Sequence, residues 1–299
     1  MSEDKRDCDT PRRGATDSSR RDFLAASVAA GLTAAGGRAF AAQSTIAEND
    51  VIVKTPDGNC DAALFHPSAG VHAAVLIWPD AFGLRPVFRD MARRVAAEGY
   101  TVLVPNPFYR VAKAPVFDDV ASFDFSNQAQ MAQLQPLMSS IKETAAVEKD
   151  ATACIAFLDG QPQVDKHRKV GTQGYCMGGR LVVITAAARA DRVGAGASFH
   201  GGGLVTDKPD SPHLLAPRIK ARMYFAVASS DDQRQPDAKD KLKAAFATAH
   251  VPAEVEVYPA RHGWCVPDMP SEGGAPIYDK VQAERAWGKL VALYRRALG

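Results

Sequence analysis

Short apolar runs alternate with longer stretches of helical periodicity along most of the chain. Residues 73–78 read AAVLIW, a continuous apolar run that is typical of a buried strand. The following stretch, 86–99, repeats apolar side chains on one helical face, among them Phe88, Met91 and Val95, and it ends in glycine. This change of period from one segment to the next predicts a strand followed by a helix.

The same reading extends over the rest of the chain. Strands are predicted at 51–53, 62–65, 73–78, 101–104, 170–175, 193–199, 221–228 and 253–258, and helices at 86–99, 139–158, 178–188, 236–249 and 280–298. Alternating strands and helices favour an α/β fold with a mostly parallel central sheet and helices on both faces. Residues 106–128 show little periodicity and carry several aromatics, so they are predicted to form a lid or binding loop.

The composition fits one globular domain. The chain has 299 residues, of which 46% are hydrophobic and 23% charged, enough to bury a single large core. The formal net charge is +2, and no cluster of Lys and Arg alternates with aromatics after the N-terminus. Nucleic acid is therefore not an expected partner.

The N-terminal 41 residues carry the three features of an export signal in the correct order. Arg20 and Arg21 precede an Ala-rich apolar run at 23–36, and 39–41 (Ala-Phe-Ala) is a small-x-small cleavage site. The apolar run is shorter than the roughly 20 residues that span a bilayer, so no permanent membrane span is expected.

This order predicts a cleaved twin-arginine signal peptide at 1–41 and a single domain at 42–299. The twin-arginine export machinery is then a partner, and the mature protein is periplasmic or secreted. The alternative is a disordered, Arg-containing tail with no address function.

A candidate nucleophile lies between a predicted strand and a predicted helix. Residues 174–179 read GYCMGG, which matches the G-x-S-x-G elbow of α/β-hydrolases with Cys176 in place of serine. A tight turn needs glycine at 174 and 178, and it places the Cys176 sulfur at a helix N-terminus, where the dipole favours a thiolate. The Met177 N–H would face a developing oxyanion. The alternative is a buried cysteine beside a pair of helix-packing glycines.

The base should be a histidine downstream of the nucleophile. His200, His213, His250 and His262 follow Cys176, but only His262 lies after the last predicted strand and before the closing helix. This loop is where the fold places its base. A solvated loop histidine is the alternative interpretation.

The acid should follow the strand predicted at 221–228. Asp231 and Asp232 both occupy that place. A carboxylate here can orient the imidazole and stabilise its cation. The alternative is a pair of acidic residues that act only on the dipole of the next helix. Spacing alone does not choose between the two aspartates.

The second oxyanion donor is expected in the loop directly after the strand at 73–78. Residues 79–83 (PDAFG) follow this strand, and the N–H of Ala81 is the predicted donor. The sequence His200-Gly201-Gly202-Gly203 looks like a lipase oxyanion loop, but such a loop precedes the nucleophile in the chain. His200 is therefore interpreted as part of a turn at the edge of the pocket.

Together these segments resemble the dienelactone hydrolase family over about residues 51–299. The resemblance rests on the segments 79–84 and 174–179, on Asp232 with Pro236 four residues later, and on His262-Gly263. It implies a Cys-His-Asp triad that opens cyclic enol-lactones without a cofactor. The triad would consist of Cys176, His262 and Asp232. The resemblance favours Asp232 over Asp231 because the family's aspartate stands four residues before a proline.

Two positions depart from the family pattern. The family's early loop usually carries a glutamate that hydrogen-bonds the resting thiol, and Asp80 stands there instead. The family's lactone hydrolases bind the substrate carboxylate with an arginine four residues after the histidine, and this position is Val266. Arg110 is then a candidate for carboxylate recognition, so the hydrolase class is better supported than the dienelactone substrate.

The wall of the substrate pocket is predicted from Phe82, Tyr109, His200 and Trp264, although each of them fits ordinary packing equally well. Asp80 and Arg110 complete the predicted substrate contacts. Two other functions stay open: a copper or zinc site built from Cys176, His262 and Cys265, and a catalytically silent binding protein on the same fold. The sequence does not decide whether Cys265 pairs with Cys60 or Cys154.

Overall fold

The computed structural model describes residues 45–299. The signal peptide predicted at 1–41 lies outside these described residues. Eight strands form one sheet in the order β1-β2-β4-β3-β5-β6-β7-β8. The strands are β1 (Ile46–Thr55), β2 (Gly58–Pro67), β3 (Ala74–Trp78), β4 (Thr101–Pro105), β5 (Val170–Tyr175), β6 (Val193–Phe199), β7 (Arg222–Ala228) and β8 (Ala253–Tyr258).

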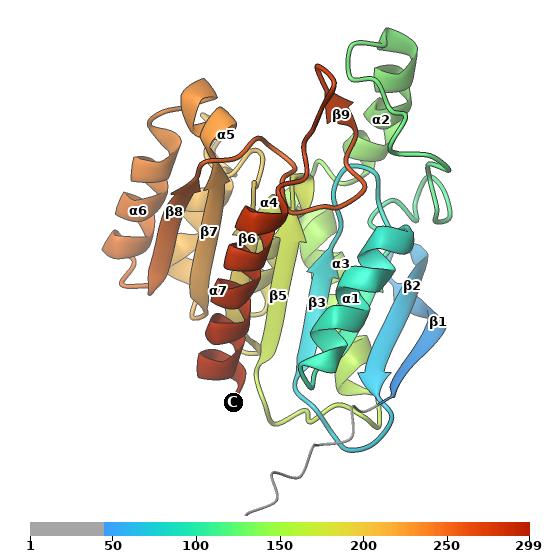
Figure 1. Cartoon of the computed structure of the whole chain (residues 1–299). Coiled ribbons are helices and arrows are strands. Elements are labelled where there is room, and N and C mark those ends of the chain that lie inside the picture. Colours follow the sequence, from blue (N-terminus) through green and yellow to red (C-terminus); the bar gives the residue numbers. More distant parts are fainter. Residues whose placement is uncertain (1–44) are drawn as a thin grey trace, which may run out of the picture. The chain divides into compact units, whose positions relative to one another are not determined.

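Strands β3 to β8 are parallel to one another, whereas β2 is antiparallel to both β1 and β4. The central strands β3, β4 and β5 are fully buried because helices cover both faces, which explains the continuous apolar run of β3. The sheet order and the covering helices confirm the predicted α/β-hydrolase fold (Figure 1).

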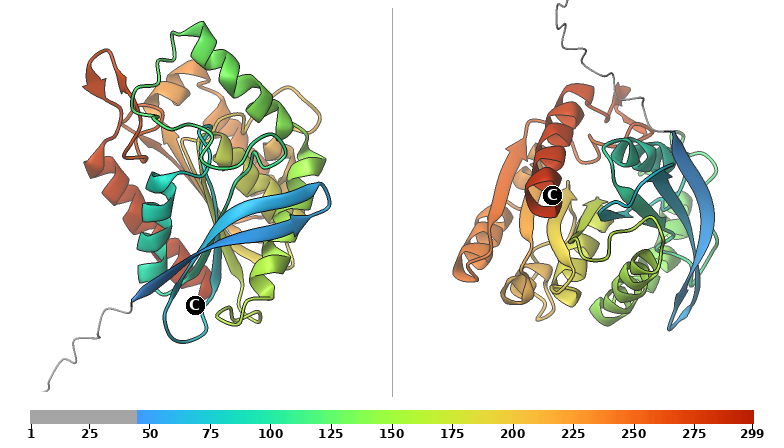
Figure 2. Two further views of the ribbon diagram at one scale, coloured as in Figure 1. Left: turned by 90° about the vertical axis from the view of Figure 1, so that its right-hand side faces the viewer. Right: turned by 90° about the horizontal axis from the view of Figure 1, so that it is seen from below.

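The helices divide between the two faces of the sheet. On one face, α1 (Pro86–Ala97) and α7 (Lys280–Leu298) pack through Phe88, Val95, Leu290 and Tyr294. The other face is covered by α3 (Thr144–Asp159), α4 (Met177–Ala188), the short 3-10 helix η1 (Pro212–Arg218) and α6 (Ala238–Thr248). Figure 2 shows the two helical layers on either side of the sheet.

The remaining elements lie near the C-terminal ends of the parallel strands (Figure 1). They are α2 (Gln128–Ser140), α5 (Ser229–Arg234) and the two-stranded ribbon of β9 (Ser271–Glu272) and β10 (Ala275–Pro276). The segment predicted as a lid is therefore a loop followed by α2. The helix predicted at 139–158 begins later, at Thr144, after α2 has ended.

No helix among residues 45–299 is both long enough and apolar enough to cross a membrane.

Candidate active site

The turn from β5 to α4 is a sharp elbow with Cys176 at its tip. Cys176 has φ 53° and ψ −118°, a left-handed backbone conformation that is rare outside glycine. Glycine is required on both sides of it. A Cβ on Gly174 would lie 2.2 Å from the Gly178 carbonyl oxygen, and one on Gly178 would lie 2.4 Å from that of Trp78. The predicted elbow geometry is therefore present.

The elbow leaves the Cys176 side chain partly exposed at the N-terminus of α4. No side chain caps this helix; the Gly179 N–H donates to the Cys176 carbonyl, whereas the Met177 N–H remains available to an anion. The backbone N–H of Cys176 donates to the Phe199 carbonyl and to Nδ1 of His200, both at 3.1 Å. These bonds fix the elbow to the end of β6.

His262 lies beside the elbow in the loop after β8. Its Nδ1 is 2.7 Å from Oδ2 of Asp231, and its backbone N–H donates to Ser230 Oγ at 2.9 Å. Ser229 donates from both its N–H and its hydroxyl to the Ala260 carbonyl. The loop that carries His262 is therefore joined to the start of α5 by side-chain and backbone bonds.

The orienting acid differs from the residue favoured by the family pattern. Asp232 accepts a 2.7 Å hydrogen bond from Lys239 Nζ, whereas Asp231 contacts His262. Both aspartates lie in the first turn of α5, where successive side chains point about 100° apart around the helix axis. Only one of them can face the imidazole, and the geometry places Asp231 there, not Asp232.

The environment of His262 favours its charged form. Burial lowers its pKa, but the charge and hydrogen bond of Cys176, together with those of Asp231, outweigh burial and raise the pKa to about 10. An imidazolium at neutral pH is the partner that a thiolate needs. Asp231 and Cys176 thus both act on His262 and favour its imidazolium form.

The two backbone N–H groups predicted as oxyanion donors belong to the loop after β3 and to the first residue of α4. Neither the Ala81 nor the Met177 N–H forms a hydrogen bond within residues 45–299. Asp80 shapes the loop that carries Ala81, because its Oδ1 accepts the Phe82 N–H at 2.9 Å and its carbonyl accepts the Gly83 N–H. The two donors predicted from sequence are available for this role.

Asp80 is held by an ion pair that the sequence did not indicate. Arg85 donates to both carboxylate oxygens of Asp80, at 2.7 and 3.0 Å, and to both oxygens of Asp268, at 2.7 and 2.8 Å. Asp80 and Arg85 are almost fully buried. The Asp80 carboxylate therefore faces Arg85, which corrects its predicted role as a substrate contact beside the thiol.

His200 lies beneath the site and does not form the edge of the pocket. It is completely buried, with its ring centroid 4.9 Å from that of His262 and 5.2 Å from that of Trp264. Burial and the charge of His262 hold the pKa of His200 well below its usual value, so the ring is neutral and its Nδ1 accepts the Cys176 N–H. His200 supports the elbow from behind.

Two other residues predicted to line the pocket, Trp264 and Phe82, pack against other aromatic side chains instead. Trp264 is fully buried and stacks on Tyr258, and Phe82 packs in an aromatic cluster with Phe117, Phe123 and Phe125. These rings serve packing, because neither lines the cavity beside Cys176.

Tyr109 and Arg110 belong to a separate polar cluster. The Tyr109 hydroxyl and the Arg110 guanidinium both bind the buried carboxylate of Asp150, and Arg110 also pairs with Asp57 at 2.8 Å. With its donors held by two carboxylates, Arg110 does not offer a binding site for a substrate carboxylate. That prediction is corrected by the structure.

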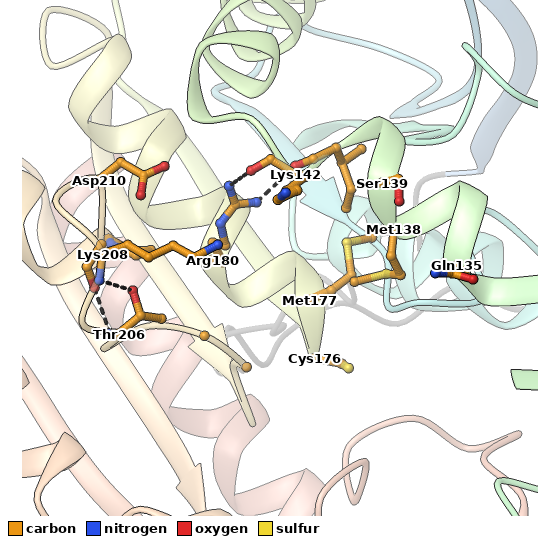
Figure 3. Close-up of a pocket in the computed structure, with 15 residues that line it drawn as sticks. Gln135, Met138, Ser139, Lys142, Cys176, Met177, Arg180, Thr206, Lys208 and Asp210 are labelled. Carbon is orange, nitrogen blue, oxygen red and sulfur yellow. Dashed lines mark hydrogen bonds between the residues drawn. The ribbon is translucent and has the colours of Figure 1, made fainter. Parts of the chain in front are cut away.

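A cavity of about 520 Å³ opens beside the nucleophile. Cys176 and Met177 line it, together with residues from α2, α4 and the segment 202–212 (Figure 3). The cavity was only partly anticipated from sequence: the turn after His200 supplies Gly202 and Gly203, whereas α2 and residues 206–212 carry no motif. Arg180, one helical turn after Cys176, is the part of this wall that the elbow motif itself brings into place.

The residues of the metal hypothesis do not form a site. Within residues 45–299, no three side chains of His, Cys, Asp or Glu gather in a way that could hold a metal ion. Cys265 is buried on the side of the sheet covered by α7, next to Trp287 and Leu290. In the described residues Cys60, Cys154, Cys176 and Cys265 are all free thiols.

Comparisons with known proteins agree on the family of this chain. The model of the dienelactone hydrolase family matches residues 60–298. A carboxymethylenebutenolidase homologue of Methylorubrum extorquens is 28% identical over 282 residues, covering 90% of this chain and 92% of that protein. The carboxymethylenebutenolidase of Rhodococcus opacus is 26% identical over 253 residues, covering 82% and 90% of the two chains.

A solved structure shares the fold. A dienelactone hydrolase-like promiscuous phosphotriesterase from metagenomic libraries superimposes with a TM-score of 0.67 at 24% identity. The match covers 85% of this chain and 99% of that one.

Proposed function

Because this chain belongs to the dienelactone hydrolase family, we propose that it hydrolyses an ester or lactone through a thioester on Cys176. His262 is the proton carrier and Asp231 orients it. The observation that carries this proposal is the contact of His262 with both Asp231 and Cys176 at the tip of the elbow. An enol-lactone is a favourable substrate because its leaving group is good and a cysteine nucleophile suits it.

In the first half of the reaction the Cys176 thiolate attacks the carbonyl carbon and a carbon–sulfur bond forms. The carbonyl oxygen becomes an oxyanion and is stabilised by the N–H groups of Met177 and Ala81. The tetrahedral intermediate then collapses, the bond to the leaving oxygen breaks, and the imidazolium of His262 protonates the alkoxide or enolate. The product of this half is a thioester with a neutral His262.

The second half requires His262 to act as a base. The thioester sulfur carries no negative charge, so the contribution of Cys176 to the raised pKa of His262 is lost once the acyl group is attached. Neutral His262 takes a proton from water, and the hydroxyl adds to the thioester carbonyl. The intermediate expels the Cys176 thiolate and releases the carboxylic acid. The change in sulfur charge thus resets the base between the two halves.

The test uses p-nitrophenyl acetate and a neutral enol-lactone with wild type and Cys176→Ala. We expect wild type to hydrolyse at least one of them and the variant to lose this activity by more than about a thousandfold. Intact-mass spectrometry after rapid acid quench should show an acyl adduct on wild type only. Equal rates for the two proteins, or an adduct on Cys176→Ala, would exclude Cys176 as nucleophile.

We also propose that residues 1–41 direct the folded protein to the twin-arginine pathway and are cleaved before Ala42. This rests on the order of Arg20-Arg21, the apolar run and the 39–41 site. In cell fractionation, the wild type should appear outside the cytoplasm at the shorter mass. A variant with Arg20→Lys and Arg21→Lys keeps the charge and should stay inside at full length. Wild type retained uncleaved in the cytoplasm would reject the proposal.

A further inference from the structure

The cavity beside Cys176 has a charged end that the hydrolytic chemistry does not use. Lys142, Arg180 and Lys208 all line it, whereas Asp210 is the one carboxylate among its lining residues within the described chain. The lining therefore carries two more positive than negative charges. In Figure 3, Arg180 lies between Cys176 on one side of the cavity and Lys208 and Asp210 on the other.

These cations lack acidic partners. Lys142 and Lys208 are exposed and form no ion pair with any residue in 45–299. Arg180 donates to two backbone carbonyls, Ile141 at 3.0 Å and Lys142 at 2.5 Å, and to no carboxylate. Burial lowers the pKa of Arg180, and the charges of Asp210 and Glu143 offset only part of that effect. Asp210 itself accepts a hydrogen bond from Thr144.

The uncharged part of the wall is largely apolar. Met138, Ile141, Met177 and Pro212 contribute apolar side chains, and the uncharged polar residues of the lining are Gln135, Ser139, Thr206 and Ser211. Arg180 lies four residues after Cys176 on α4, so its backbone is about 6 Å further along the helix axis. A chain of several methylene groups would span this interval. A volume of about 520 Å³ is more than a small lactone ring requires.

We propose that this cavity binds the acyl part of the substrate and selects an apolar acyl chain that ends in a carboxylate, as in a monoester of a medium-length dicarboxylic acid. The apolar wall covers the chain, and Lys142, Arg180 and Lys208 bind the terminal anion. The proposal rests on the proposed function. It assigns anion recognition to Lys142 between α2 and α3, Arg180 on α4 and Lys208 in the segment after β6, three residues that no sequence motif marked.

The test compares two substrates of equal length, p-nitrophenyl hydrogen adipate and p-nitrophenyl methyl adipate. The first ends in a carboxylate and the second in a neutral methyl ester. The measured quantity is the ratio of kcat/KM for the acid to kcat/KM for the methyl ester. A partly desolvated charge bound by cationic donors should give wild type a ratio of about ten or more, with the preference residing in KM.

The double variant Lys142→Gln and Lys208→Gln should lower this ratio by about tenfold. Lys54→Gln is the matched control, because it removes a positive charge from the edge strand β1 and should leave the ratio unchanged. In wild type, raising the salt concentration from about 0.05 M to 0.5 M should also lower the ratio, because exposed charges are screened.

A wild-type ratio near one, a ratio that resists salt, or an equal effect of Lys54→Gln and the double variant would overturn the proposal. Failure of the proposed function is distinguishable from these results. In that case neither ester is hydrolysed, or Cys176→Ala hydrolyses both as fast as wild type. Cys176-dependent hydrolysis without charge preference would reject only the acyl-chain inference.

Discussion

At the scale of single residues, two adjacent aspartates in α5 have different partners. Asp231 binds Nδ1 of His262 at 2.7 Å, whereas Asp232 binds Lys239 at the same distance. A carboxylate on Nδ1 fixes the tautomer and stabilises the imidazolium. Asp232 bound to a lysine has no such effect on the imidazole, because its carboxylate does not contact the His262 ring.

We therefore predict unequal effects for the same substitution at neighbouring positions. Asp231→Asn should lower kcat/KM by about a hundredfold to ten-thousandfold, since the amide no longer stabilises charged His262. Asp232→Asn should stay within about threefold of wild type. Both are measured on the ester that wild type hydrolyses best. A larger loss in Asp232→Asn than in Asp231→Asn would contradict the assignment.

At the residue scale, the sequence placed Cys176 and His262 in the expected turns where a motif or the strand order fixes the backbone. Cys176 follows from the glycines that its turn requires, and His262 from its place after the last strand. The choice of Asp232 rested on the family's Asp–Pro spacing, whereas the orientation of side chains around α5 places Asp231 against His262. Arg85 was missed because its two partners, Asp80 and Asp268, are joined only by the fold.

At the scale of elements, Arg85 connects two loops that carry different parts of the site. The loop after β3 holds Ala81, and the loop after β8 holds His262 and Asp268. Arg85 bridges them through Asp80 and Asp268, and the Arg85 and Asp80 side chains are 2% and 3% exposed. Because a buried charge without a partner is costly, this link should matter for stability as well as for the relative placement of the two loops.

We predict that Arg85→Met lowers the free energy of unfolding by about 3–5 kcal/mol, because it leaves the Asp80 carboxylate buried and unpaired. The double variant Asp80→Asn and Arg85→Met should recover part of this loss. Arg89→Met, which removes a partly exposed pair with Glu48 and Asp50, should cost no more than about 1 kcal/mol. Urea unfolding measures all three, and a loss in Arg85→Met no larger than in Arg89→Met would contradict the prediction.

The parallel strands were predictable as short segments alternating with helices, and the closing helix from its amphipathic period. Helix α2 was not, because Pro136 interrupts it and only Leu134 and Leu137 are buried. Its two buried leucines belong to different hydrophobic clusters. The sequence therefore shows no single apolar stripe from which the helix could be predicted. The ribbon of β9 and β10 has strands of only two residues, too short to produce an alternating pattern.

At the scale of the whole molecule, the fold of residues 45–299 separates one accessible thiol from three enclosed ones. Cys60, Cys154 and Cys265 are at most 8% exposed, whereas Cys176 is partly exposed at the elbow. Burial raises the pKa of the Cys60 thiol to about 12 and holds those of Cys154 and Cys265 well above their usual values. The enclosed thiols are therefore protonated and shielded, which suits a protein proposed to work in an oxidising compartment.

We predict that iodoacetamide at pH 7.5 modifies Cys176 in the folded protein and leaves Cys60, Cys154 and Cys265 almost unlabelled. Peptide mass mapping measures each site separately, which also keeps Cys8, outside the described residues, apart from the others. Prior addition of a slowly hydrolysed ester should protect Cys176, because the same sulfur would carry the acyl group. Labelling in urea is the control, and there all sites should react. Labelling of Cys265 as fast as Cys176 in the folded protein would contradict the prediction. Solvent access and thiol reactivity would then not single out Cys176 as the nucleophile of the thioester mechanism.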